Sequence, residues 1–207
     1  MVGRLFTYVI KNDAGFAPNP FHGMLTLNCC KPDIRLEAQV GDWVAANTAA
    51  DFPAGRGLLV YAMRVTDKKT MAEYDAWTRR ELPEKIPSAR SRHYAKRAGD
   101  SVYDFDANPP TRRRDGFHSP EDMDRDLRGY YTLLSEHFYY FGGSPVEVPE
   151  HLRPIIHKGR AHKWRPNEPY VEDFVAWIAS EFEPNRLYGM PHGVPRSHEF
   201  VRIGSRP

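Results

Sequence analysis

Proline and glycine residues are scattered along the whole chain and limit the length of any helix. The 207 residues include 18 prolines and 15 glycines, and they are not clustered. Each proline fixes φ and removes a backbone donor, so it ends or kinks a helix that it enters. The pattern favours a single α+β domain over residues 1–207, with peripheral helices around a small bent or barrel-like, mostly antiparallel sheet.

Short runs rich in β-branched and aromatic residues predict the strands of this sheet. Residues 43–46 and 58–65 are expected to form an antiparallel pair joined by a long loop. The remaining strands are predicted over 5–10, 130–135 and 137–142. Alternation in the last run places His137, Tyr139 and Phe141 on one face of the sheet.

Three segments carry helix signals. Thr70 and Glu73 form a capping-box pattern at the start of 70–80, and Ser119 with Pro120 predicts a helix that runs to about residue 128. Apolar residues at helical spacing predict a helix over 171–182.

Two other segments carry no regular signal. Residues 82–117 are polar and contain few periodic apolar positions, so we expect a long loop or lid that adds little to the core and borders the ligand cleft. The tail from 189 to 207 is expected to be coil.

Charge and hydropathy exclude several classes of protein. The formal net charge is +2, which is too small for a field that covers the whole molecule. No apolar stretch approaches the roughly 18–20 residues that span a bilayer, so no membrane association and a cytoplasmic location are expected. Cys29 and Cys30 are adjacent and cannot build a disulfide framework.

The spacing of the histidines and cysteines matches no common metal-binding motif, and phosphate-binding glycine loops are missing. No metal and no cofactor are therefore expected. Cys30 beside Lys31 is the one local pair that suggests a thiol nucleophile, because a lysine favours the thiolate. The competing interpretation is a buried, structural cysteine.

The most informative segment runs from 19 to 35 and continues to Trp43. Phe21 or Trp43 offers a face for stacking on a base, and Asn19 can donate to and accept from a base edge. Lys31 and Arg35 are expected to contact phosphate. Against this, the tryptophan could belong to the core, and Asn-Pro is a common turn dipeptide.

Two further places could contribute to a site. His137 lies in an aromatic run and could act as a general acid or base, or could be a satisfied core histidine. From 151 to 167 there is no carboxylate, and Arg160 and His162 in this basic run could contact phosphate. The alternative for the basic run is an ordinary solvated loop.

Residues 19–35, followed by Val-Gly-Asp-Trp at 40–43, resemble the family called nucleotide modification associated domain 2. The segments 58–65, 99–103 and 134–142 occur in a similar order, so the resemblance covers most of the chain. It implies a small prokaryotic or phage protein found beside DNA-base-modification systems, with no defined reaction. The early segment is also similar to the small barrels of the PUA, ASCH and EVE groups.

We therefore expect a protein that binds or recognises a nucleotide or a modified base in nucleic acid, with DNA preferred to RNA. One alternative is an enzyme that acts on a nucleotide or modified base and uses His137 or Cys30. The other is an interaction protein without a small-molecule site.

Overall fold

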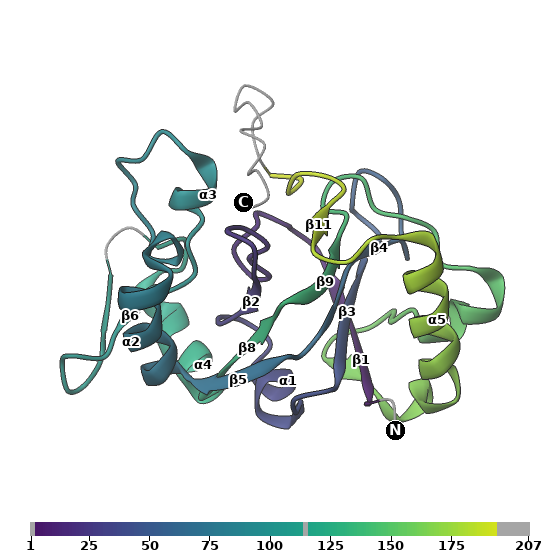
Figure 1. Ribbon diagram of the computed structural model, residues 1–207, viewed down its shortest axis with the longest axis horizontal. Helices are drawn as coiled ribbons and strands as arrows, with labels where there is room; N and C mark the ends of the chain where they lie inside the picture. Colours follow the sequence, from purple (N-terminus) through teal and green to yellow (C-terminus); the bar gives the residue numbers. More distant parts are fainter. Residues whose placement is uncertain (1–2, 114–115, 194–207) are drawn as a thin grey trace.

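The computed structural model describes residues 3–113 and 116–193, and a six-stranded sheet lies at its centre (Figure 1). The strand order is β10-β1-β3-β4-β9-β11. The strands are β1 (Leu5–Ile10), β3 (Trp43–Thr48), β4 (Leu59–Arg64), β9 (His137–Tyr140), β10 (His162–Lys163) and β11 (Arg186–Leu187). β1 pairs with β3, and β9 with β11, in parallel; the other pairs are antiparallel, including the predicted pair β3 and β4.

Two smaller sheets complete the β structure. One has the order β2-β8-β5 and is antiparallel, and the other is the hairpin of β6 and β7. Their strands are β2 (Leu25–Leu27), β5 (Asp67–Thr70), β6 (Tyr103–Asp104), β7 (Thr111–Arg112) and β8 (Tyr131–Ser135). The α+β class with peripheral helices is confirmed, and the sheets are open at their edges instead of closed into a barrel.

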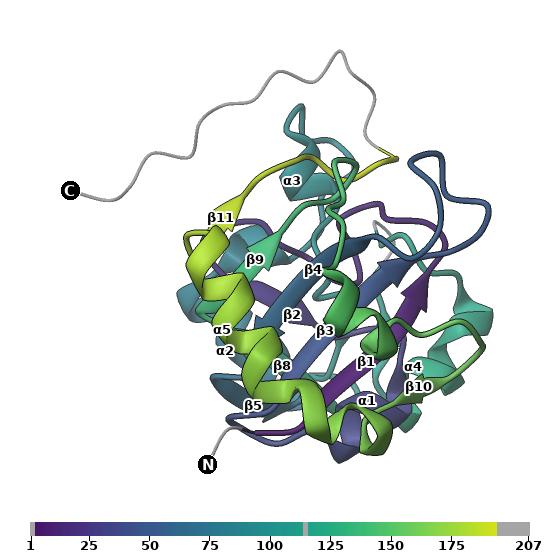
Figure 2. The same ribbon diagram turned by 90° about the vertical axis from the view of Figure 1, so that its right-hand side faces the viewer.

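Short helices surround the sheets. They are α1 (Pro32–Glu37), α2 (Met71–Glu81), α3 (Tyr94–Arg97), α4 (Met123–Arg128) and α5 (Val171–Glu181), with 3-10 turns η1 (Pro83–Lys85), η2 (Pro120–Asp122), η3 (Glu150–Ile155) and η4 (Arg165–Tyr170). The capping box of Thr70 and Glu73 forms at the start of α2 as predicted. In Figure 2, α5 lies across one face of the large sheet.

Alternating side chains divide the core between the two faces of the large sheet. Phe138 and Tyr140 pack on the face that is shared with β2, β8 and α1, whereas Tyr139 and Phe141 pack on the α5 face. The predicted alternation in this run is therefore confirmed. A third, smaller cluster joins Phe16 to residues of α2 and β6.

Residues 82–117 contribute more to the interior than their composition suggested. Lys85 and Asp100 are completely buried, and so is Val102. The ammonium group of Lys85 donates to the Asn19 side-chain oxygen at 2.6 Å and to the Met24 carbonyl at 2.8 Å. The expectation of little core was wrong because it counted apolar residues, whereas charged groups can be buried once hydrogen bonds satisfy them.

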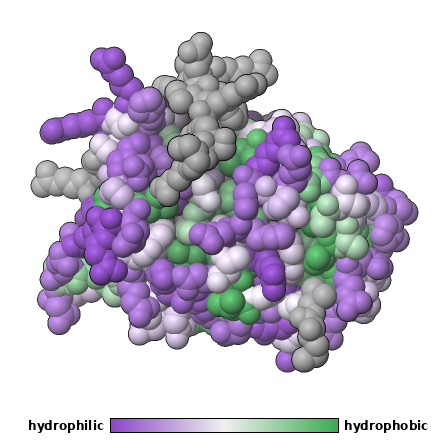
Figure 3. All heavy atoms as spheres, in the orientation of Figure 1, coloured by the Kyte–Doolittle hydropathy of each residue, from purple (hydrophilic) through white to green (hydrophobic). Residues whose placement is uncertain are grey.

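The face of the molecule drawn in Figure 3 is mostly hydrophilic where it is coloured, with small and separate hydrophobic patches. Among the described residues, no helix is both long enough and apolar enough to cross a membrane. Most of the tail that was expected to be coil, from 194 onward, lies outside the described residues.

Candidate functional site around Cys30

A sharp turn between β2 and α1 presents the Cys30 side chain. Cys30 and Lys31 have φ angles of 59° and 41°, in the left-handed region. A side chain in this region costs roughly 1–2 kcal/mol per residue, so the surrounding structure must hold the turn in place. Pro32 then starts α1 with a φ angle that suits a first helical position.

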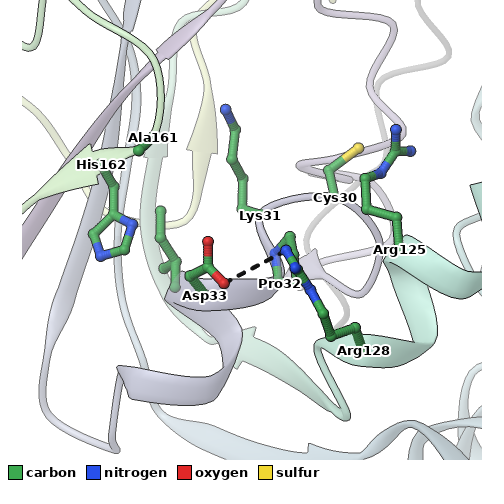
Figure 4. A pocket seen from close by; sticks show the side chains of 9 residues that line it. Cys30, Lys31, Pro32, Asp33, Arg125, Arg128, Ala161 and His162 are labelled. Atoms are coloured by element: carbon green, nitrogen blue, oxygen red, sulfur yellow. Dashed lines mark ion pairs between the residues drawn. The ribbon is translucent and has the colours of Figure 1, made fainter.

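The turn forms one wall of a pocket of about 330 Å³, which we call the Cys30 pocket (Figure 4). Its residues come from the turn and α1, from α4, and from the start of β10. They are Cys30, Lys31, Pro32, Asp33, Ile34, Arg125, Arg128, Ala161 and His162. In Figure 4 the Cys30 sulfur and the side chains of Lys31 and Arg125 point toward the same side of the pocket.

Cys30, His118 and Asp126 are linked in series. The Cys30 Sγ lies 3.5 Å from Nε2 of His118, and the other ring nitrogen, Nδ1, is hydrogen-bonded to the Asp126 carboxylate. Asp126 also accepts from the Cys30 backbone N–H at 3.0 Å and from the Tyr103 hydroxyl at 2.9 Å. One buried carboxylate thus fixes both the imidazole ring and the backbone that carries the thiol.

The same contacts shift the charge states of the pair. Burial opposes a charge on His118, but hydrogen bonds with Asp126 and Cys30 favour it, and together they raise the pKa of His118 to about 9. Burial also opposes ionisation of Asp126, yet the contacts with His118, Cys30 and Tyr103 hold the pKa of this carboxyl below its ordinary value. At neutral pH the pair is therefore an imidazolium and a carboxylate.

Arg35 holds this arrangement together from the inside. Its side chain is fully buried and donates to the carbonyl oxygens of Cys30 at 2.8 Å, Tyr131 at 2.7 Å and Asp126 at 2.6 Å. The predicted contact between Arg35 and a phosphate is corrected by this burial. The guanidinium has no surface to offer a ligand, because it is fully buried and its nitrogens donate to these three carbonyls and to the Met71 sulfur.

The pocket contains four side chains that can carry a positive charge. Arg128 is 3.6 Å from Asp33, and both side chains are more than half exposed. Arg125 is 2.8 Å from Asp122, and His162 is 3.8 Å from Glu37. Lys31 forms no ion pair within the described part of the chain: its ammonium lies 4.3 Å from the centre of the Tyr8 ring and 3.4 Å from the Val9 carbonyl.

Within residues 3–113 and 116–193, one set of side chains could hold a metal ion. Ligand atoms of Cys29, His118 and Asp126 lie within 4.8 Å of one another. However, Cys29 is fully buried, which raises the pKa of its thiol well above the ordinary value, and its Sγ lies 3.8 Å from the Asp100 carbonyl. Hydrogen bonds within the protein already engage both Asp126 oxygens and the ring of His118, so the cluster is satisfied without an ion.

Asn19 and Phe21 belong to a different part of the molecule. Asn19 is fully buried, donates to the Ala98 carbonyl at 2.8 Å and accepts from Lys85. Phe21 is 3% exposed and packs edge-on against Tyr94 at 6.3 Å. Their polar and aromatic groups are used within the fold, and neither residue lines the Cys30 pocket.

Trp43 and His137 meet each other, but on the α5 face of the sheet. Their ring centroids are 5.4 Å apart, and Trp43 is 3% exposed beside Phe174. Burial and the nearby Arg64 lower the pKa of His137.

Arg160 is exposed and directly precedes the pocket residues at 161 and 162, but it does not line the pocket itself. Of the predicted site residues, only Cys30, Lys31 and His162 line the Cys30 pocket.

Sequence reasoning missed His118, Asp126 and the two arginines of α4. Cys30 and His118 are 88 positions apart, and no spacing rule links them. The available signal was weak: His118 directly precedes the predicted helix start at Ser119, and arginine and aspartate alternate along the helix that follows.

The comparisons with known proteins concern the whole chain. The family described as nucleotide modification associated domain 2 matches residues 2–198. No curated protein and no solved structure gives a significant match. Because the match spans nearly all of the 207 residues that carry the fold and the Cys30 pocket, the chain belongs to the nucleotide modification associated domain 2 family.

Proposed function

We propose that the protein binds a nucleotide, or one nucleotide unit of nucleic acid, in the Cys30 pocket. The observation that carries this proposal is the convergence of Lys31, Arg125, Arg128 and His162, from three separate elements, around one hollow with a single carboxylate, Asp33, in its lining. Cations arranged in this way neutralise phosphate. The family's association with nucleotide modification supports a nucleotide as the source of that phosphate.

The size of the pocket suits a small ligand. Its volume of about 330 Å³ lies near the lower end of the range for small-molecule sites, about 300–1,000 Å³. A mononucleotide, or a base flipped out of a strand together with its phosphate, is therefore a better occupant than a stacked oligonucleotide.

The weak ion pair between Arg128 and Asp33 leaves the arginine available for a ligand. Exposed pairs of this kind contribute about 0–1 kcal/mol, so a phosphate can replace the carboxylate at little cost. Lys31 is held over the Tyr8 ring with its ammonium in the pocket wall. Partial burial lowers the pKa of Lys31, and the charge of a phosphate would oppose that shift.

The test is a calorimetric titration of nucleoside monophosphates into the wild type and into the variants Lys31→Ala and Arg128→Ala. A hydrogen bond to a charged group contributes about 1.5–3 kcal/mol, so each variant should lose roughly 10- to 150-fold in affinity. Arg186→Ala is the matched control, because Arg186 is an exposed arginine paired with Glu183 at the opposite edge of the sheet. Equal affinities in all four proteins would contradict the proposal.

For a longer ligand, we propose that the basic run from 151 to 167 follows the backbone of a DNA strand that leads into the pocket. Arg160 is exposed beside the pocket residues and can contact a DNA phosphate. Lys163 is a poorer candidate for such a contact, because its ammonium already donates to the Ile156 carbonyl at 3.3 Å. The affinity for a short single-stranded DNA should fall as salt rises, and Arg160→Ala should reduce the slope. Equal binding of matched DNA and RNA strands would remove the preference for DNA.

The alternative of an enzyme is favoured by one specific observation, the series of hydrogen bonds that joins Cys30, His118 and Asp126.

A further inference from the structure

We propose that Cys30, His118 and Asp126 form a catalytic triad in which the Cys30 sulfur attacks an acyl carbon, of an amide or an ester, in a substrate that carries a phosphate. The phosphate would occupy the cationic side of the Cys30 pocket. The substrate class therefore rests on the proposed nucleotide binding, whereas the reactivity of the thiol rests on the geometry of the three residues alone.

The order of the three groups is that of a nucleophile, a base and a group that orients the base. His118 turns Nε2 toward the sulfur at 3.5 Å and Nδ1 toward the Asp126 carboxylate, so each ring nitrogen has one partner. This arrangement recurs on unrelated folds and is recognised by geometry, not by position in the sequence. A separation of 3.5 Å is an ordinary distance for a hydrogen bond in which one atom is sulfur.

The imidazole ring is held on several sides. Asp126, which orients it, is itself fixed by the Tyr103 hydroxyl and by the Cys30 backbone N–H. Phe16 packs edge-on against the His118 ring, with the ring centroids 4.6 Å apart. A base that is held in one orientation loses little freedom in the transition state, which is the purpose of an orienting carboxylate.

The backbone at Cys30 also differs from that of a structural cysteine. Two successive residues in the left-handed region place the thiol on a sharp turn between a strand and a helix. A strained turn of this kind exposes the nucleophile of other hydrolases. Cys29, one residue earlier, is completely buried beside the Asp100 carbonyl and provides an internal comparison.

Protonation of the pair fits this role. Because His118 carries a proton at neutral pH, its Nε2–H can be donated to the sulfur and to the group that leaves when the sulfur attacks. Lys31 and Arg125, which interact electrostatically with Cys30, lie on the same side of the pocket. Positive charges on this side of the pocket would favour the negative charge that develops when the sulfur adds to a carbonyl.

The reaction needs no oxidant or reductant. The thiolate forms a carbon–sulfur bond with the acyl carbon, and the carbonyl electron pair moves onto oxygen. When this electron pair returns and re-forms the carbonyl, the bond from the acyl carbon to the amine nitrogen or alcohol oxygen breaks. The amine or alcohol leaves with the proton from His118 Nε2. Water then loses a proton to His118 and attacks the thioester. The carbon–sulfur bond breaks, the acid is released, and the thiolate and the imidazolium are restored.

The test uses p-nitrophenyl acetate as an acyl donor, with release of p-nitrophenolate and acetylation of Cys30 followed by peptide mass spectrometry. We expect the wild type to become acetylated at Cys30 and Cys29→Ala to react at the same rate. His118→Gln should slow acetylation by about 100-fold or more, the lower end of what general acid–base catalysis supplies. Asp126→Asn should slow it as well and change its pH dependence, and circular dichroism must show that each variant is folded.

The triad would be overturned if Cys30 of the wild type were acetylated no faster than free cysteine, or if wild type and folded His118→Gln were acetylated at equal rates. An acetylation rate that rises after treatment with EDTA would also overturn it, because it would mean that a metal holds the thiol. Because the ester carries no phosphate, the result does not depend on nucleotide binding. Protection of Cys30 by adenosine monophosphate would place the nucleotide and the thiol in one pocket. Acetylation without such protection would leave the triad standing and would contradict only the phosphate-bearing substrate.

Discussion

The guanidinium of Arg35 donates to the main-chain carbonyl of Asp126 at 2.6 Å, and both residues are fully buried. Because a second branch of the same guanidinium donates to the Cys30 carbonyl, one side chain ties the turn that carries the thiol to the helix that carries the carboxylate. The fully buried Arg35 side chain therefore sets the distance between α1 and α4 at the pocket.

We predict that Arg35→Met destabilises the protein by about 3 kcal/mol or more, because it removes three hydrogen bonds from a buried guanidinium to main-chain carbonyls, and each hydrogen bond to a charged group contributes about 1.5–3 kcal/mol. Of the three carbonyls, that of Asp126 keeps a second donor, the Gly129 N–H. Arg35→Lys should recover only part of the lost stability, since one ammonium cannot replace a planar fork. Urea unfolding measures the change. Arg128→Met, at an exposed arginine of the same pocket, should stay within about 0.5 kcal/mol of wild type. Similar losses in both variants would contradict the role given to Arg35.

Gly129→Ala should destabilise the protein by roughly 1–3 kcal/mol, the usual cost of overpacking, although the φ of −68° at Gly129 is one that alanine adopts readily. A Cβ at this position would lie 2.3 Å from the Arg35 Cζ, and the buried guanidinium has no room to withdraw. Thermal melts of this variant and of Gly159→Ala provide the comparison. At Gly159 the nearest atom to an added Cβ is 3.8 Å away, so a matching loss there would show that the effect is not due to Arg35.

The hydrogen bonds that raise the pKa of His118 to about 9 should make its contribution to stability depend on pH. The contribution is fully present below the unfolded pKa, about 6.5, and is lost as the pH rises through 9. The free energy of unfolding of wild type minus that of His118→Gln should therefore fall between pH 6.5 and 9.5, by at most about 3 kcal/mol. Asp126, Asp122 and Cys30 face the ring, and a difference that rises over this interval would contradict the assignment.

Asn19→Ala should weaken folding without weakening nucleotide binding. The change removes an acceptor from the Lys85 ammonium and a donor from the Ala98 carbonyl, both buried, and should cost about 2 kcal/mol or more. Melting temperature and calorimetric affinity are measured on the same samples. Reduced affinity with an unchanged melting temperature would restore the original prediction that Asn19 reads a base edge.

Local patterns predicted the longer elements of the fold, but not its short strands and short helices. The β-branched and aromatic run at 5–10, the capping box at Thr70 and the apolar spacing from Val171 onward each involve residues within a few positions of one another. The pairing of the strands carried no such local signal, because paired residues can be far apart in the sequence. The parallel pair of β1 and β3 joins Leu5 to Trp43, and a strand and a helix lie between them in the chain.

The candidate site could be predicted only in part, for the same reason. Cys30 and Lys31 were found because they are neighbours, but the partners of the thiol come from a segment that begins almost ninety positions later. Arg35 was expected to contact a phosphate because charged residues are seldom buried. No neighbouring residue in the sequence indicates that three main-chain carbonyls accept hydrogen bonds from it. The same reasoning failed for Lys85.

The outer side of β1 is paired with β10 only at Thr7 and Tyr8. Beyond these two residues, side chains replace a neighbouring strand: Asn167 donates to the Leu5 carbonyl at 2.9 Å, and Lys31 donates to the Val9 carbonyl at 3.4 Å. These two carbonyl acceptors on the outer side of β1 are therefore not free to pair with a strand from another molecule. Lys31 therefore occupies one of the acceptors that an added strand would need, and its replacement would leave the Val9 carbonyl without this donor.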